Sequence, residues 1–182
     1  MSINLSDLEI IDFPSAPLFV YREKIGPFQV NAPKAWQEFW ESTSTWFNRD
    51  NSTMMLSANF IDGTKEGDDK YLYRAGVILK TPPECLPEGK SSCFWNFNGD
   101  LPCVSSSLIG ITLGDLDGGK YAKFLLTGPY SQLALAFPTA YTEIGRCDLT
   151  TRTAFAFEVY LNTPASVSDE SQLLTEIYIP VN

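Results

Sequence analysis

Strict alternation of residue types marks the segment from Arg152 to Pro164 as a β-strand, because strand side chains point to opposite faces in turn. A core face would consist of the odd positions, which are Phe155, Phe157, Val159 and Leu161. The other face would carry two alanines, a carboxylate and a phenol: Ala154, Ala156, Glu158 and Tyr160. This second face is either a solvated surface or the floor of a hollow that holds Glu158.

The C-terminal segment repeats this pattern. One parity holds Leu173, Thr175, Ile177, Ile179 and Val181, and the other holds Glu176, Tyr178 and Pro180. The polar stretch 165–172 between the two segments predicts a hairpin. Each strand then carries a glutamate with a tyrosine two residues later.

Two amphipathic helices are predicted from apolar residues at helical spacing. In the first, these residues are Trp36, Phe39, Trp40, Thr43 and Phe47. In the second, they are Leu133, Phe137, Ala140, Tyr141 and Ile144. We expect Asn31 to cap the first helix, with Pro33 near its first turn, and Pro138 to kink or restart the second. Further strands are expected at 8–13, 18–24, 53–61, 70–80 and 120–126.

The two junctions between a strand and a helix look alike, since a Gly-Pro pair followed by an aromatic residue occurs at Gly26 and again at Gly128. Each is followed by a helix and two strands, which indicates an internal repeat. We therefore expect an α+β fold, a duplicated βαββ arrangement of two SHS2-like halves. Its antiparallel sheet would carry two helices that flank a central groove.

Residues 84–107 form the least regular part of the chain and contain Phe94, Trp95 and Phe97. A stretch of this length without regular structure is often functional. It would either cover an apolar cavity or pack on the surface, and we interpret the slightly longer segment 84–113 as an insertion.

Composition narrows the choice of function. A chain of 182 residues is expected to form a single domain, 1–182. Its net charge of −9 argues against nucleic acid and against an anionic membrane, and it suits a cationic or neutral ligand. The N-terminus has no signal-peptide pattern, so we expect a cytoplasmic protein.

With no histidine and no Cys-x-x-Cys pair, we expect no metal site and no cofactor, and Ser-His or Cys-His catalysis is excluded.

Four stretches in this order resemble the GyrI-like small-molecule-binding domain, the effector-binding module of DNA gyrase inhibitor-like proteins and multidrug-sensing bacterial regulators. These stretches are residues 73–77, 118–130, 157–164 and 174–181. The resemblance covers the chain apart from 84–113 and suggests the stand-alone form. It implies a duplicated βαββ fold whose groove binds amphipathic, often cationic compounds, with Glu158 as the pocket carboxylate. Some stand-alone relatives hydrolyse cyclopropanoid compounds.

Three functions follow as hypotheses. The first is binding of aromatic, cationic small molecules, with Glu158 as the charge and a wall of Trp40, Trp95, Tyr141, Tyr160 and Tyr178. The second is hydrolysis of a cyclopropanoid-type electrophile, with Glu158 as general base and Tyr160 or Tyr178 as acid or orienting group. In that case, burial or a nearby Glu176 would raise the pKa of Glu158. The third is a protein-interaction role such as gyrase inhibition, for which no residue localises an interface.

Overall fold

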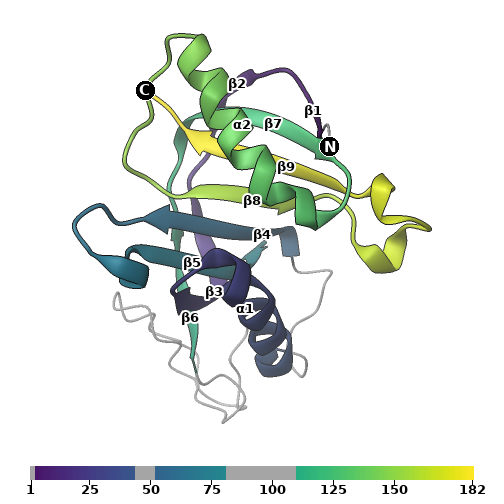
Figure 1. The fold of residues 1–182 in the computed structure, drawn as a ribbon. Helices are drawn as coiled ribbons and strands as arrows, with labels where there is room; N and C mark the ends of the chain where they lie inside the picture. Colours follow the sequence, from purple (N-terminus) through teal and green to yellow (C-terminus); the bar gives the residue numbers. More distant parts are fainter. Residues whose placement is uncertain (1–2, 44–51, 81–109) are drawn as a thin grey trace. The chain divides into compact units, whose positions relative to one another are not determined.

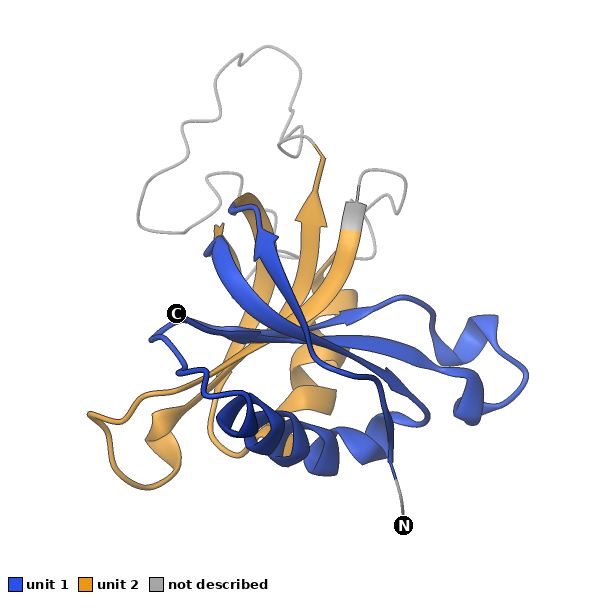
Figure 2. Ribbon diagram, turned by 90° about the horizontal axis from the view of Figure 1, so that it is seen from above, with its two compact units in different colours: residues 1–15, 117–182 blue, residues 16–116 orange. Residues whose placement is uncertain are grey.

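The structure is a computed structural model that describes residues 3–43, 52–80 and 110–182. These residues form antiparallel strands, two α-helices, short 3-10 helices and the loops between them, which places the chain in the predicted α+β class. The chain divides into two compact units (Figure 2). Unit 1 comprises residues 1–15 and 117–182, and unit 2 comprises residues 16–116.

Unit 2 is an antiparallel sheet with one helix. Its elements are β3 (Ala16–Ile25), α1 (Phe28–Thr43), β4 (Ser52–Ile61), β5 (Tyr71–Leu79) and β6 (Ile111–Leu116). β5 lies between β3 and β4, and β6 pairs with β3. The core under α1 is formed by Val20, Phe39, Val77, Leu79 and Ile111. Gly76 is required here, because a Cβ atom at this position would overlap the carbonyl oxygen of Val20 on β3.

Unit 1 follows the same plan. Its elements are β1 (Asn4–Leu5), β2 (Glu9–Phe13), β7 (Gly119–Thr127), α2 (Leu133–Arg146), β8 (Ala156–Tyr160) and β9 (Leu174–Pro180). β9 lies between β7 and β8, while β1 and β2 both pair with β7. α2 packs over this sheet (Figure 1). Ala136, Ala140 and Ile144 of the helix contact a buried apolar cluster on β7 and β9.

Both units thus contain strand, helix, strand and strand in that order, and in both the last of these strands lies in the middle. This is the predicted element order. A duplication as the origin of the two units stays a prediction. The final residues of the expected insertion 84–113 lie in β6, which begins at Ile111, and the rest are outside the described residues apart from Gly110.

α1 begins at Phe28, so the prediction that Asn31 caps it was wrong. Gly26 has a φ of 125°, which lets the chain turn sharply out of β3. The carbonyl of Pro27 then accepts hydrogen bonds from the backbone N–H groups of Val30 and Asn31. The Asn31 side chain donates to the carbonyl of Ile25 at 3.1 Å, and Pro33 lies inside the helix.

α2 continues through Pro138, so the helix does not restart there. The missing N–H of a proline affects one hydrogen bond, to the carbonyl four residues earlier. Packing of the apolar face of α2 on the sheet compensates for that loss. Among the helices of the described ranges, none is long and apolar enough to cross a membrane.

The strand predicted from Arg152 to Pro164 is shorter in the structure, where β8 covers only Ala156–Tyr160. Leu161, expected in the core, is 51% exposed. It follows the last paired residue, and a 3-10 turn at Pro164–Ser166 then leads the chain away from the sheet. Phe157 and Val159 are buried as predicted.

Candidate functional site

The register of β8 and β9 decides which way Glu158 points. Glu158 lies opposite Ile177, and Tyr160 lies opposite Thr175. Residues directly opposite each other in an antiparallel pair share a face of the sheet. Ile177 belongs to the cluster beneath α2, so Glu158 and Tyr160 lie on the face that α2 covers.

Glu158 is a buried carboxylate with a phenol bound to it. Only 6% of the residue is exposed. The Tyr160 hydroxyl donates a hydrogen bond to Glu158 Oε2 at 2.8 Å. The preceding residue on this face is Ala156, also buried, whose small side chain occupies little of the space beside the carboxylate. The sequence prediction of a sheltered carboxylate next to a phenol and a small residue agrees with this geometry.

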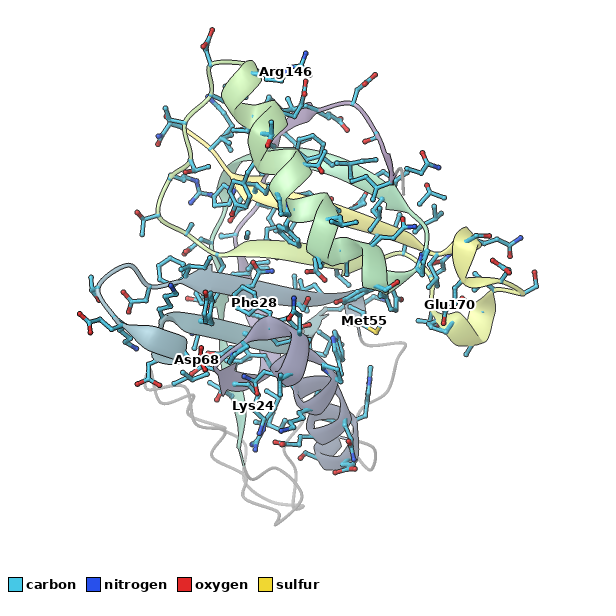
Figure 3. All side chains as sticks on the ribbon, in the orientation of Figure 1. Lys24, Phe28, Met55, Asp68, Arg146 and Glu170 are labelled. Atoms are coloured by element: carbon cyan, nitrogen blue, oxygen red, sulfur yellow. The ribbon has the colours of Figure 1, made fainter. Side chains whose placement is uncertain are left out.

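A second phenol, which the sequence analysis did not select, completes this group. Tyr130 contacts Tyr160 edge to face, with ring centroids 5.2 Å apart, and its hydroxyl donates to the carbonyl of Asn162. Burial raises the pKa of Tyr130, and the charges of Glu158 and Glu170 raise it further. Its hydroxyl therefore stays protonated at neutral pH. Glu170 lies in the loop between β8 and β9 (Figure 3).

The signal that could have identified Tyr130 was the repeat itself. Tyr130 follows Gly128-Pro129 at the start of one helix, just as Phe28 follows Gly26-Pro27 at the start of the other. The two positions differ by one hydroxyl group. A hydroxyl present in only one of the two similar turns is the difference that a comparison of the two turns would have selected.

The structure does not bring Tyr178 or Glu176 to Glu158. Tyr178 lies opposite Phe157 and stacks on its ring at 4.5 Å, so both point to the other face of the sheet. There the Tyr178 hydroxyl donates to Glu176 at 2.6 Å, and Lys123 forms an ion pair with Glu176 at 2.8 Å. Burial, followed by the bond to Glu176, raises the pKa of Tyr178. The proposed influence of Glu176 on Glu158 therefore has no geometric basis.

Tyr141 lies on α2 with 46% of its surface exposed. The small residues Ala136 and Ala140 face the sheet in its place. Tyr141 is therefore available at the surface of unit 1 and takes no part in the apolar cluster.

Trp40 belongs to α1 in unit 2. Its ring stacks on that of Trp36 at 5.8 Å, and Phe39 contacts it edge to face at 5.0 Å. Both tryptophans pack against the core of unit 2 and remain partly exposed. The predicted groove involves both units and stays a prediction, as does the place of Trp40 in it. Trp95 and Phe47 lie outside the described residues.

The part of the chain that the structure describes contains no group of three or more His, Cys, Asp or Glu side chains suited to a metal ion. The Glu158 group consists of a sheltered carboxylate beside two phenols. Such a group can accept hydrogen bonds and attract a cation, and its rings can contact apolar surface.

Comparison with known families gives a match over nearly the whole chain. A family model described as "GyrI-like small molecule binding domain" matches residues 6–182. A search of curated proteins found no match.

Several solved structures have a similar fold. The EcmrR C-terminal domain is 12% identical with a TM-score of 0.61, and the alignment covers 100% of this chain and 99% of that one. SAV2435, in a structure bound to tetraphenylphosphonium, is 16% identical with a TM-score of 0.58, over 97% and 94% of the two chains. An integron cassette protein from Vibrio cholerae is 13% identical with a TM-score of 0.57, over 100% of both.

Proposed function

The chain belongs to the GyrI-like small-molecule-binding family, and we propose that it binds amphipathic aromatic cations whose charge is compensated by Glu158. The observation that carries this proposal is the burial of Glu158, which is 6% exposed, beneath α2 and beside two phenols. The related fold of SAV2435, whose structure contains tetraphenylphosphonium, supports this ligand class.

The physical argument concerns the cost of a charge in a sheltered position. A carboxylate removed from water loses hydration, and a cation that reaches it restores part of that stabilisation. A lipophilic onium ion loses little hydration of its own on entry, because its charge is spread beneath apolar groups. Glu158 should therefore select cations over neutral molecules of the same shape.

The aromatic contacts would come from Tyr160 and Tyr130, whose rings lie next to the carboxylate, and from the exposed Tyr141 on α2. Each cation–π contact contributes about 0.5–2 kcal/mol. Contacts of this kind depend weakly on ligand shape. We expect micromolar affinity and a broad range of ligands.

The test removes the negative charge of the Glu158 side chain while keeping the shape of that side chain. We expect Glu158→Gln to weaken binding of tetraphenylphosphonium, measured by isothermal titration calorimetry, about tenfold or more, which corresponds to about 1.4 kcal/mol. The matched control is Glu176→Gln on the neighbouring strand. Glu176 also accepts a hydrogen bond from a tyrosine, but it lies on the opposite face and pairs with Lys123. The control should change affinity less than about twofold; equal effects of the two substitutions would contradict the proposal.

A second candidate function is hydrolysis of a cyclopropanoid-type electrophile. The observation that favours it is the hydrogen bond from Tyr160 to Glu158, since a general base is commonly held by an orienting group at this distance. Incubation of the protein with such a compound should open the cyclopropane ring, which chromatography of the products would detect. Glu158→Gln should abolish this reaction. A compound that binds and is recovered intact would rule out hydrolysis for that class.

A further inference from the structure

Two buried polar atoms of unit 1 form no hydrogen bond with any described residue: Thr175 Oγ1 and Gln132 Oε1. Buried polar groups in native proteins nearly always have a partner, because an unsatisfied one loses its hydration without compensation. Two such atoms at the same end of one sheet therefore indicate a position that accommodates a polar group from another molecule.

Thr175 lies next to Glu158 and its phenol. It is fully buried on β9, opposite Tyr160 on β8 and opposite Leu126 on β7. Leu126 belongs to the cluster beneath α2. The Thr175 hydroxyl is therefore on the same face as Glu158, and Tyr160 is its direct neighbour across the strands, at about 5 Å between Cβ atoms.

Gln132 reaches the same end of the sheet from the helix. It directly precedes α2, and its Oε1 atom would lie 2.8 Å from a Cβ atom placed on Gly128. The side chain is thus folded back over Gly128, whose φ of 141° and lack of a side chain leave room for it. The N–H of Gly128 donates to the carbonyl of Leu173, which fixes this point beside β9. Gly128 directly follows β7 and is two residues from Leu126, or about 7 Å along an extended chain.

Tyr160 lies directly opposite Thr175, Tyr130 contacts the Tyr160 ring, and both phenols are partly exposed. Tyr160 is also the donor to Glu158. A ligand that displaces the Tyr160 ring would therefore gain access to the Glu158 carboxylate and to the Thr175 hydroxyl at the same time.

We propose that Thr175 and Gln132 form a hydrogen-bonding subsite beside Glu158 that binds a neutral N–H or O–H group of the ligand. The inference rests on the proposed function, and it narrows the ligand class. Gln132 Oε1 only accepts hydrogen bonds, while the Thr175 hydroxyl both donates and accepts, so the pair selects a donor. The preferred ligands are aromatic cations that carry an amino or hydroxyl group apart from their charge.

The experiment compares two probes that differ by one donor group: tetraphenylphosphonium and (4-aminophenyl)triphenylphosphonium. The wild-type protein should bind the amino compound about three- to tenfold more tightly, the range expected for one added hydrogen bond. Thr175→Val, which removes the hydroxyl and preserves the shape, should reduce this ratio to about one. Gln132→Met should reduce it in the same direction.

Thr43→Val is the matched control. Thr43 is equally buried, but it lies in unit 2, and its hydroxyl donates to the carbonyl of Phe39 at 2.7 Å. The Thr43→Val substitution should leave the ratio of the affinities for the two probes at the wild-type value. Without ligand, Thr175→Val should raise the melting temperature because it removes an unsatisfied buried group, whereas Thr43→Val should not raise it.

The outcomes separate the two proposals. If neither probe binds, or if binding does not depend on Glu158, the proposed function fails. If tetraphenylphosphonium binds through Glu158 but the amino group adds no affinity, the subsite is refuted while the function stands. A lower melting temperature of Thr175→Val with an unchanged ratio would also refute it, since the hydroxyl would then serve the fold alone.

Discussion

Glu158 and Glu176 show how neighbours decide the role of a residue. Each lies on one strand of the same hairpin and accepts a hydrogen bond from the tyrosine two residues later. Lys123 compensates the charge of Glu176 on one face of the sheet. Glu158 lies on the other face, beneath α2, with two phenols beside it. Because Glu158 but not Glu176 lies on the face that α2 covers, the two carboxylates are expected to respond differently to a cationic ligand.

A prediction at the residue scale concerns the end of α2. Asp148 is exposed and has a φ of 56°, a left-handed conformation that glycine adopts without steric cost. Its negative charge also lies near the helix C-terminus, where the helix dipole disfavours it. Asp148→Gly should raise the free energy of unfolding by about 0.5–1 kcal/mol, measured by urea denaturation.

Asp148→Ala is the control, because it removes the charge and keeps a Cβ atom in the left-handed conformation. It should stabilise the protein less than glycine does. A glycine variant less stable than the alanine variant would show that the backbone conformation at Asp148 carries no cost.

At the scale of elements, the alternation of residue types predicted β8 and β9, because the two-residue period of a strand is a local property. It did not predict which faces of the two strands coincide. That depends on the register, in which Tyr178 lies opposite Phe157 and thus away from Glu158. The alternation therefore placed Tyr160 beside Glu158, because the two share one strand, but it could not place Tyr178, which lies on another strand and points to the other face.

The prediction of helix boundaries from the sequence was limited by a different factor. Asn31 has the side chain of an N-cap residue, but the backbone turn at Gly26 and Pro27 starts α1 earlier and directs the Asn31 amide to the carbonyl of Ile25. Thr175 and Gln132 could not be selected from the sequence, since a threonine and a glutamine become notable only when their partners are known.

A prediction at the element scale concerns the attachment of α1 to β3. Glu38 on α1 accepts a hydrogen bond from Arg22 Nε at 2.6 Å and forms an ion pair with Lys24, which is labelled in Figure 3. The hydrogen bond from Lys24, followed by that from Arg22, lowers the pKa of Glu38 below its ordinary value of 4.5. Because the folded-state pKa is lowered, this stabilisation is present above pH 4.5 and is lost as the pH falls through the folded value.

Glu38→Gln should therefore lower the free energy of unfolding at pH 7 by about 0.5–1 kcal/mol, the range for a part-exposed ion pair. The difference from wild type should disappear in acid, as followed by urea denaturation at a series of pH values. Glu41→Gln, on the exposed side of the same helix, is the control. A difference for Glu38→Gln that persists at low pH would show that the charge does not hold α1 to β3.

At the scale of the whole molecule, the relevant quantity is the net charge of −9. A negative surface attracts cations over a distance set by the ionic strength. Raising the salt concentration from about 0.01 M to about 1 M shortens the screening length from about 30 Å to about 3 Å. The association rate of tetraphenylphosphonium, measured by stopped-flow fluorescence, should fall several-fold.

The salt effect should be similar in wild type and Glu158→Gln, because all surface charges contribute to the long-range attraction. The dissociation rate should carry most of the difference between the two proteins. An association rate that depends on salt only when Glu158 is present would assign the attraction to that single carboxylate.

The strand pairing of unit 1 has a consequence for how the gene can be rearranged. Both chain termini belong to this unit, since β1 pairs with Thr127 at one end of β7 and Pro180 of β9 pairs with Tyr121 at the other. The gap between these points is about 20 Å, which a linker of about ten residues spans. A circular permutant opened just before Asp117 would encode unit 1 as one uninterrupted stretch, whereas deletion of the first fifteen residues would remove β1 and β2 from the edge of β7.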